Sequence, residues 1–418
     1  MPRRFVSGVR FEKDFCLRKI FNREKRRIIM FWTLEEEKKG WIQEIYQKVE
    51  RKYRQVRERS KDKIPAMAIN GVHDDRSDTS KEWSIDNGIN WWTNGFFAGI
   101  LWQLYQAGKD ERYAEIARIL EEKMDACFLA YYGLHHDVGF MWLPTAVADY
   151  RLTGNLDSRR RGLLAANLLA GRFNPAGKFI RAWNELDGAK ERNRGWAIID
   201  CMFNIPLLYW ASEELDDPRY RQIAMLHADT AMKYFIRENG SVRHIIEFDA
   251  ESGNYLRSHG GQGYGHGSSW TRGQTWAIYG FALSYLHTGK KEYLDTAVRV
   301  ADYFKGRLNA ECLVPIDFDQ PAEPAYEDST AAAIAACGFL ELGEILKERG
   351  KGYFETGLRL FSVLTEKRCD FSEDTDGILQ KCSGSYHGTS DREVNFVYAD
   401  YYYVEALLRL MDKRFLIF

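Results

Sequence analysis

The chain has 418 residues, with 59 Lys and Arg, 60 Asp and Glu, and a formal net charge of −1. This balance argues against a broad surface for nucleic acid or for an anionic membrane, because both need an excess of basic residues. The 12 Trp, 23 Tyr and 24 Phe are mostly core residues, but an excess of Trp also suits sugar binding, because apolar sugar faces stack on flat rings.

The seven cysteines are scattered, form no CxxC pair and are odd in number. This pattern favours reduced thiols in a cytoplasmic protein over a disulfide framework. We therefore expect a cytoplasmic location. The sequence leaves a monomer and a homodimer both open.

The first 29 residues carry ten Lys and Arg and three Asp and Glu, a net charge of +7. They have no continuous apolar stretch and no small-residue cleavage site, so they make a poor signal peptide. We predict a flexible basic arm over residues 1–29, or a translation start at Met30, followed by a single domain over residues 30–418. No run of about 18 apolar residues stands out, so no membrane-spanning helix is expected.

After the basic arm, a pair of helices is repeated along the chain. A nearly apolar stretch such as GFFAGILWQLYQ precedes a short polar break and then an amphipathic stretch such as AEIARILEEKM. Apolar residues recur at helical spacing in each, so the first helix suits an inner position and the second an outer one. The expected helices lie near residues 33–60, 92–107, 111–128, 140–153, 156–172, 196–213, 217–236, 270–287, 291–306, 329–348, 351–367 and 393–413.

Six inner and six outer helices predict an all-α fold, a closed (α/α)6 barrel. The alternative is an open solenoid, which usually shows a tighter period and polar end caps.

The segments leading into the inner helices carry residues that are unusual for loops, whereas the connections from inner to outer helix are short and plain, such as DDPRY. This asymmetry predicts one functional face with a cleft. In chain order, the residues are Trp91, Trp92, His135, His136, Asp137, Trp183, Asp200, Arg272, Trp276 and Tyr386.

Two carboxylates in this set suit acid–base chemistry. Asp200 lies in an apolar run, where burial raises the pKa of a carboxyl group as a general acid requires. The alternatives are a structural hydrogen bond for Asp200 and a helix N-cap for Asp137. Arg272 either pairs with one of these carboxylates or binds a substrate anion, which its planar guanidinium suits.

Metal and nucleotide sites are not expected. Adjacent histidines such as His135 and His136 rarely point to the same ion, and no HExxH or HxH companion is present. The glycine-rich residues 260–267 follow no convincing strand and lack the Lys-Ser/Thr of a P-loop. We therefore predict no metal and no cofactor, and what remains is carboxylates and Trp, the equipment of sugar hydrolysis.

The stretches HHDVGF, WAIIDCMFNIPLLYW and WTRGQTWAIYGF resemble the signatures of the unsaturated glucuronyl hydrolases, glycoside hydrolase family 88. WWTNGFFAGILW and His244 in SVRHIIEFD add to the likeness, which runs from about Trp83 to the C-terminus. The resemblance implies an (α/α)6 barrel that removes 4,5-unsaturated glucuronic acid from oligosaccharides produced by polysaccharide lyases.

The resemblance also implies residue roles. Asp200 would protonate C4 of the unsaturated uronate and activate the water that adds at C5, giving a hemiketal whose collapse breaks the glycosidic link. Asp137 would stabilise the developing charge or position the sugar. The implied pocket further contains His244, Arg272, Trp91 or Trp92, Trp183, Trp276 and Tyr386.

Three rival functions stay open. An unsaturated rhamnogalacturonyl hydrolase acting on pectin fragments has a related barrel and similar chemistry. A sugar 2-epimerase would ask for several histidines on inner helices, but the nine His lie mostly in predicted loops. A non-catalytic sugar-binding protein would not need both Asp137 and Asp200.

Overall fold

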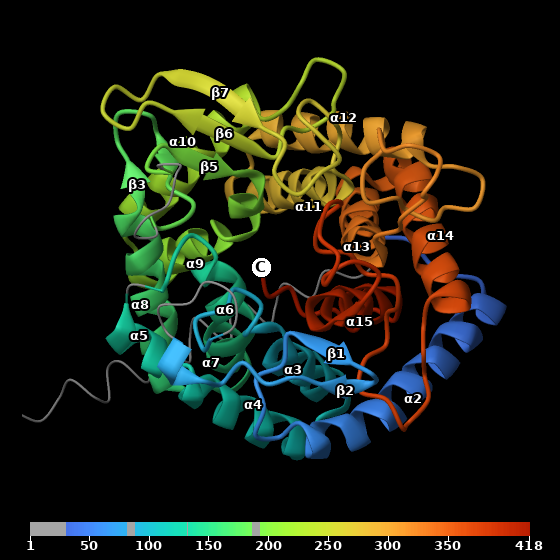
Figure 1. Ribbon diagram of the computed structural model, residues 1–418. Coiled ribbons are helices and arrows are strands. Elements are labelled where there is room, and N and C mark those ends of the chain that lie inside the picture. The colour runs from blue at the N-terminus through green and yellow to red at the C-terminus, as the bar shows by residue number, and fades with distance from the viewer. Residues whose placement is uncertain (1–30, 82–87, 132, 186–192) are drawn as a thin grey trace, which may run out of the picture.

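Inner and outer helices alternate around a ring (Figure 1). The computed structural model describes residues 31–81, 88–131, 133–185 and 193–418, so the predicted arm lies outside the described residues. The inner ring contains α3 (Phe96–Gly108), α6 (Val138–Trp142), η2 (Leu143–Val147), α7 (Ala148–Thr153), η3 (Ile199–Phe203), α9 (Pro206–Leu215), α11 (Thr271–Thr288), α13 (Ser329–Leu346) and α15 (Val397–Leu410). The outer layer contains α2 (Glu36–Arg59), α4 (Glu111–Lys123), α8 (Leu156–Gly171), α10 (Pro218–Tyr234), α12 (Lys291–Arg307) and α14 (Lys351–Lys367).

The two ends of the sequence close this ring. The last inner helix, α15, packs against both α13 and the first inner helix, α3. The first outer helix, α2, covers α15 from outside, so it completes the last pair rather than the first. The predicted (α/α)6 barrel is confirmed, and the open solenoid is wrong. The single-domain boundary at residues 30–418 stays a prediction.

Burial separates the two layers as their sequences predict. In α13 every residue from Ser329 to Gly343 is buried, because the helix is packed on all sides. Its neighbour α12 buries one stripe at helical spacing and exposes the rest. That stripe contains Tyr293, Leu294, Thr296, Ala297, Val300, Ala301 and Phe304.

The segment Ser329–Lys367 is long and apolar enough, by composition, to cross a membrane, with a mean hydropathy of 1.4 in its most apolar window. No membrane-spanning helix is expected from the sequence. In the barrel 83% of that window is buried, so the inner position of α13 accounts for its composition.

Short antiparallel strands cover the end of the ring at which chain segments enter the inner helices (Figure 1). One sheet has the order β2 (Val72–His73), β1 (Met67–Ile69), β8 (Asn395–Phe396), and a second pairs β3 (Phe173–Asn174) with β4 (Phe179–Ile180). The third has the order β5 (Trp196–Ile198), β6 (Ile245–Phe248), β7 (Tyr255–His259).

Two predicted helices differ in detail. The helix expected near residues 140–153 contains a π-helical segment, η2, in its middle, where Pro144 has no N–H to donate to the α-helical ladder. The helix expected near residues 196–213 starts as strand β5, because Trp196 and Ile198 pair with Glu247 and Ile245 of β6. That pairing is long-range, so local periodicity does not reveal it.

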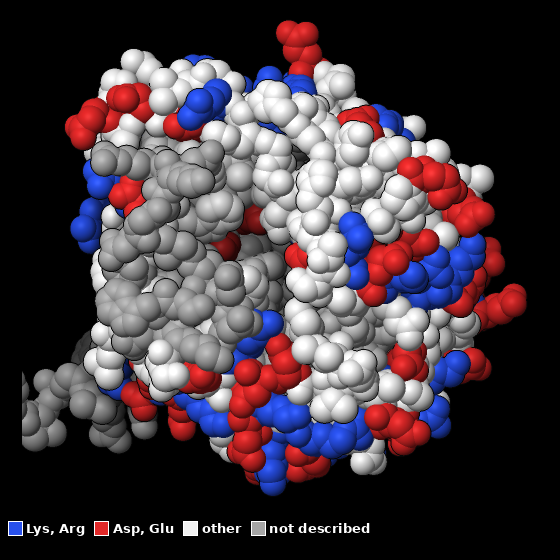
Figure 2. Space-filling model, in the orientation of Figure 1, with Lys and Arg blue, Asp and Glu red and all other residues white. Residues whose placement is uncertain are grey.

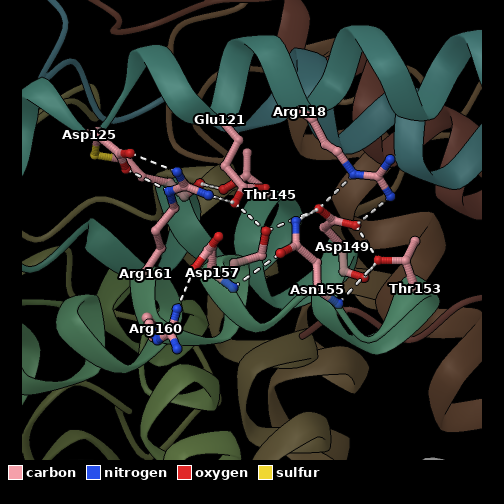
Figure 3. Close-up of polar contacts among 12 residues, drawn as sticks. Arg118, Glu121, Asp125, Thr145, Asp149, Thr153, Asn155, Asp157, Arg160 and Arg161 are labelled. Atoms are coloured by element: carbon pink, nitrogen blue, oxygen red, sulfur yellow. Dashed lines mark hydrogen bonds and ion pairs between the residues drawn. The ribbon is translucent and has the colours of Figure 1, made fainter.

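A buried polar network ties α4 and α8 to the inner helix α7 (Figure 3). The fully buried Asp149 carboxylate accepts hydrogen bonds from Arg118 at 3.0 and 3.1 Å, from Asn155 at 2.8 Å and from Ser158 at 3.0 Å. Ser158 also donates to Glu121 at 2.6 Å. One carboxylate therefore holds three helices together.

Replacing Asp149 with alanine is expected to lower the free energy of unfolding by about 3 kcal/mol, because several buried donors lose their acceptor. Urea denaturation measures this loss. The control is Asp157→Ala, which breaks an ion pair with Arg160 whose side chains are both 69% exposed. Its loss is expected to be about 0.5 kcal/mol or less. Equal losses in the two variants would contradict the structural role of the Asp149 network.

Candidate active site

The strand-covered end of the barrel is hollowed at its centre, and acidic atoms are visible inside the hollow (Figure 2). The segments before α6, α9, α11 and α15 meet at this end. The sequence predicted one functional face from the same segments. Its chemistry depends on how the two aspartates are placed.

Asp200 lies in η3, directly after strand β5. Its Oδ1 is buried and has no hydrogen-bond partner among the described residues, so no structural hydrogen bond to this atom within that part of the chain explains the residue. Burial, together with the negative charge of Asp137, raises the pKa of Asp200 to about 8, although Arg272 opposes the shift. Asp200 is therefore a carboxylic acid that stays protonated at neutral pH, as a general acid must.

Asp137 differs from Asp200 in its ionisation state. It occupies the N-cap position of α6, as the sequence allowed, but its side chain makes no capping hydrogen bond, so capping does not account for the carboxylate. Burial alone would raise its pKa, but His136, His135 and their contacts to the carboxylate outweigh burial and hold the pKa of Asp137 well below its usual range. The site thus contains one protonated and one ionised carboxyl group, which is the division of roles that acid catalysis with charge stabilisation requires.

Both histidines before Asp137 approach the same oxygen. His135 Nδ1 lies 3.2 Å and His136 Nε2 lies 3.3 Å from Asp137 Oδ2. The two adjacent rings therefore converge on one carboxylate oxygen. These three donor atoms lie within 4.8 Å of one another, a spacing that a metal ion could bridge, so the expectation of no metal needs a direct test.

His244 faces Asp200 across a gap. Its Nδ1 accepts a hydrogen bond of 3.0 Å from the backbone N–H of Gln262, which leaves the ring proton on Nε2. This Nε2 is buried without a partner, 4.0 Å from Asp200 Oδ1. Burial, followed by the charge of Arg272, lowers the pKa of His244 to about 3, so the ring is neutral. His244 therefore offers an N–H to a group held between itself and Asp200.

The glycine-rich residues 260–267 lie against His244 and hold its ring. Gly261 has φ +59°, and a Cβ there would lie 1.9 Å from His244 Nδ1, so only glycine fits. The backbone N–H of Tyr264 in the same loop donates to Asp317 Oδ2 at 2.9 Å. The expectation that no strand precedes the loop is wrong, because β7 ends at His259, directly before it.

Arg272 is fully enclosed at the start of α11. Its guanidinium donates to Asp328 at 2.9 Å and to the carbonyls of Ser383 and Gly384. The pairing with Asp137 or Asp200 that the sequence allowed is wrong, because the partner is Asp328. The guanidinium holds the segment that carries Tyr386, and its direct contact with a substrate anion stays a prediction.

Replacing Arg272 with alanine is expected mainly to raise KM. The rise in KM has two possible causes: loss of direct substrate binding or loss of the contacts that hold the loop. The variant Asp328→Asn separates them, because it removes the charged partner of Arg272 and keeps the guanidinium. If Arg272 binds substrate directly, KM rises much more in Arg272→Ala than in Asp328→Asn; if it acts through the loop, the two rises are similar. Steady-state kinetics measures both, and an unchanged KM in Arg272→Ala would remove the residue from the binding site.

The predicted aromatic residues occupy two kinds of position at the site: some are partly exposed, and one is fully buried beneath it. Trp91 and Trp92 are both partly exposed. Trp92 packs on Phe140 and Tyr398, with centroid distances of 5.4 and 4.9 Å, whereas Trp91 lies against the Arg76 guanidinium. Which of the two binds the sugar stays a prediction. Trp276 has no exposed surface, so the prediction of a stacking wall is wrong for this residue. Its ring packs beneath the site on Phe140, Phe203 and Tyr402.

Trp183 and Tyr386 belong to two different parts of the rim. Trp183 is partly exposed and lies 6.1 Å, centroid to centroid, from Trp196 of β5. Tyr386 is nearly buried and packs edge-on against Tyr264 at 5.0 Å. As sugar-binding residues, both stay predictions.

Sequence reasoning missed several residues of the site. Gln262 orients His244, Asp328 holds Arg272, and Asn204 donates a hydrogen bond to Asp137 at 3.1 Å. A signal existed for Asn204, because it is polar, lies in an apolar run and follows Asp200 by four residues. No local pattern indicates Asp328, whose partner is 56 residues away.

Comparison with known proteins agrees with this geometry. Residues 58–405 match the model of Glycosyl Hydrolase Family 88. The chain is 38% identical to an unsaturated glucuronyl hydrolase of Bacillus sp. (strain GL1), covering 80% of this chain and 89% of that protein. It is 34% identical to an unsaturated chondroitin disaccharide hydrolase of Streptococcus pyogenes serotype M1, covering 76% and 80%.

Solved structures agree in fold. The crystal structure of the unsaturated glucuronyl hydrolase from Bacillus sp. GL1, described as responsible for the degradation of glycosaminoglycan, is similar with a TM-score of 0.77. The identity is 34%, and the match covers 85% of this chain and 93% of that one. The barrel, the paired aspartates and these likenesses together show that the chain belongs to glycoside hydrolase family 88.

Proposed function

We propose that this enzyme removes 4,5-unsaturated glucuronic acid from the non-reducing end of lyase-generated oligosaccharides by hydrating the C4=C5 double bond. The observation that carries the proposal is the pairing of a protonated Asp200 with an ionised Asp137. A vinyl ether is protonated on carbon, so it needs a carboxylic acid poised near neutral pH and a fixed negative charge nearby.

The reaction runs in two halves. The Asp200 carboxyl group donates its proton to C4, and positive charge develops on C5 and the ring oxygen, where the Asp137 carboxylate stabilises it. The Asp200 carboxylate then takes a proton from a water molecule whose oxygen bonds to C5. The resulting hemiketal opens to a ketone at C5, which frees the ring oxygen as a hydroxyl on C1. The hemiacetal at C1 then collapses to an aldehyde and releases the reducing-end sugar as an alcohol, with one water consumed overall.

His244 supports the second half of this reaction. Its Nε2–H faces the buried Asp200 Oδ1 across 4.0 Å, with no protein partner for either atom. A water molecule between them would donate to Asp200 and accept from His244, which orients its oxygen for attack on C5. The neutral state of the ring matters for the first half, because a charged imidazolium would favour the ionised form of Asp200 before it donates its proton.

A spectroscopic assay tests the proposal. The conjugated C4=C5 carboxylate absorbs in the ultraviolet, so turnover of a lyase-derived disaccharide is followed as loss of absorbance with release of the reducing-end sugar. The panel contains hyaluronan, chondroitin, heparin-type, gellan and xanthan fragments, because the relatives named above differ in substrate. Loss of absorbance with a glucuronyl substrate is the expected result.

The other outcomes identify the rivals. Turnover restricted to unsaturated galacturonyl-rhamnose would move the enzyme to pectin fragments, and no turnover at all would favour the epimerase or the binding protein. EDTA is included because His135, His136 and Asp137 could bridge an ion. Full activity after dialysis against EDTA is expected, and loss of activity restored by added Zn²⁺ would contradict the expectation of no metal.

We also propose a cytoplasmic location. The six cysteines of the described residues are all free thiols, and five of them are buried. Unpaired thiols at buried positions suit a reducing compartment. Fractionation of the source cells with an activity assay tests this, and recovery of the enzyme outside the cytoplasmic fraction would contradict it.

A further inference from the structure

We propose that Asn204 is a positioning residue that holds Asp137 and Asp200 in register through its side-chain amide. The inference rests on the proposed function, because it assigns Asn204 to the same reaction. The two aspartates come from different elements, Asp137 from the turn before α6 and Asp200 from η3. Their relative placement therefore needs a contact between those elements.

The Asn204 amide provides that contact. The residue follows η3 and is fully buried. Its Nδ2 donates to Asp137 Oδ1 at 3.1 Å and to the backbone carbonyl of Asp200 at 3.2 Å. Its Oδ1 accepts from the backbone N–H of Phe140 at 2.9 Å. Every polar atom of the amide is thus used, and its two donor bonds go to the two catalytic residues.

The orientation of the amide is determined by its partners. The Phe140 N–H can only donate, so it must face the oxygen of Asn204, and the NH₂ group must then face Asp137. A reversed amide would place an oxygen against a carboxylate and a donor against a donor. Asn204 therefore binds the charged form of Asp137 without adding a charge of its own.

The contact is also close. Gly139, in the first turn of α6, lies against Asn204, and a Cβ at that position would come within 2.5 Å of Asn204 Cα and 2.7 Å of its Oδ1. Any larger residue at position 139 would push the two segments apart. The glycine of HHDVGF and the asparagine of WAIIDCMFN are therefore two halves of one close contact.

The variant that tests the positioning role is Asn204→Asp. Aspartate has nearly the same shape as asparagine, but an acceptor oxygen replaces the NH₂ donor that faces Asp137. At pH 7.5 the new carboxylate would repel Asp137, so kcat is expected to fall about 100-fold, with KM changing less than about threefold. At pH 5 protonation of the new carboxyl group restores a donor toward Asp137, and the loss relative to wild type is expected to shrink to about tenfold or less. In the described part of the chain, the ionisable groups around this position are His135, His136, Asp137, Arg172, Asp200 and Cys201, with Arg272 and His244 facing Asp200.

A second variant covers the case in which Asn204→Asp does not fold. Asn204→Ser has a side chain too short to reach Asp137, and its kcat is expected to be at least about tenfold below wild type at both pH values. The matched control is Asn309→Asp, since Asn309 is exposed and uses only its Oδ1, which accepts from Glu311 N and which aspartate can replace. Its kcat is expected to equal that of the wild type.

The outcomes separate this inference from the proposed function. If wild type turns over no unsaturated uronyl substrate, the proposed function fails. If wild type is active and both folded Asn204 variants keep kcat within about threefold, or if the deficit of Asn204→Asp does not depend on pH, the positioning role is wrong. A melting curve of each variant shows which ones are folded, and a purely structural role would lower the melting temperature without a pH-dependent change in kcat.

Discussion

The variant Asp200→Asn is expected to lose about 10³-fold or more in kcat while its fold and substrate affinity remain. The amide has the shape of the carboxyl group but can neither donate a proton to C4 nor take one from water, so both halves of the reaction lose their proton carrier. Substrate binding is expected to survive, because Asp200 Oδ1 makes no hydrogen bond that binding would have to replace. Initial rates from the absorbance assay give kcat, and equilibrium binding of the unsaturated disaccharide gives Kd.

The matched control for this variant is Asp216→Asn. Asp216 is exposed at the end of α9 in a left-handed conformation with φ 55°, which asparagine adopts equally well. Its kcat is expected to equal that of the wild type. Near-normal kcat in Asp200→Asn would show that the general acid lies elsewhere, whatever the control does.

The variant Asp137→Asn is expected to lose about 10²–10³-fold in kcat and to change the pH profile. The kinetic loss follows from removing a fixed charge from the place where positive charge develops. The change in the profile follows from electrostatics, because burial and then the Asp137 charge raise the pKa of Asp200. Without that charge the pKa of Asp200 falls.

The pH dependence of kcat/KM follows from these two charge states. In the wild type the protonated Asp200 is the active form, so kcat/KM is expected to be lost as pH rises through about 8. Asp137 is ionised throughout the neutral range, since its pKa lies below its usual value. In Asp137→Asn the alkaline limb of kcat/KM is expected to move to lower pH. A limb that stays in place would mean that Asp137 does not act on Asp200, and one that moves to higher pH would contradict the assigned charges.

The sequence by itself determined the fold and singled out the two aspartates as candidates. Helical periodicity is a local property, and the contrast between an all-apolar α13 and a one-sided α12 is enough to separate an inner from an outer layer. Asp200 was conspicuous for a similar reason, because a carboxyl group in an apolar run must be buried. The structure confirms the barrel and shows that burial and the charge of Asp137 raise the pKa of Asp200.

Only the tertiary structure decided which neighbours these residues meet. Trp276 reads in sequence like the other tryptophans of the site, but its ring is fully buried and contacts Tyr402 of α15 across the barrel. Arg272 donates a hydrogen bond to Asp328, and Asn204 donates one to Asp137, which is 67 residues away in the sequence. Such contacts join segments that are far apart in sequence. A periodic pattern carries information about the face a residue occupies but not about the atoms opposite it.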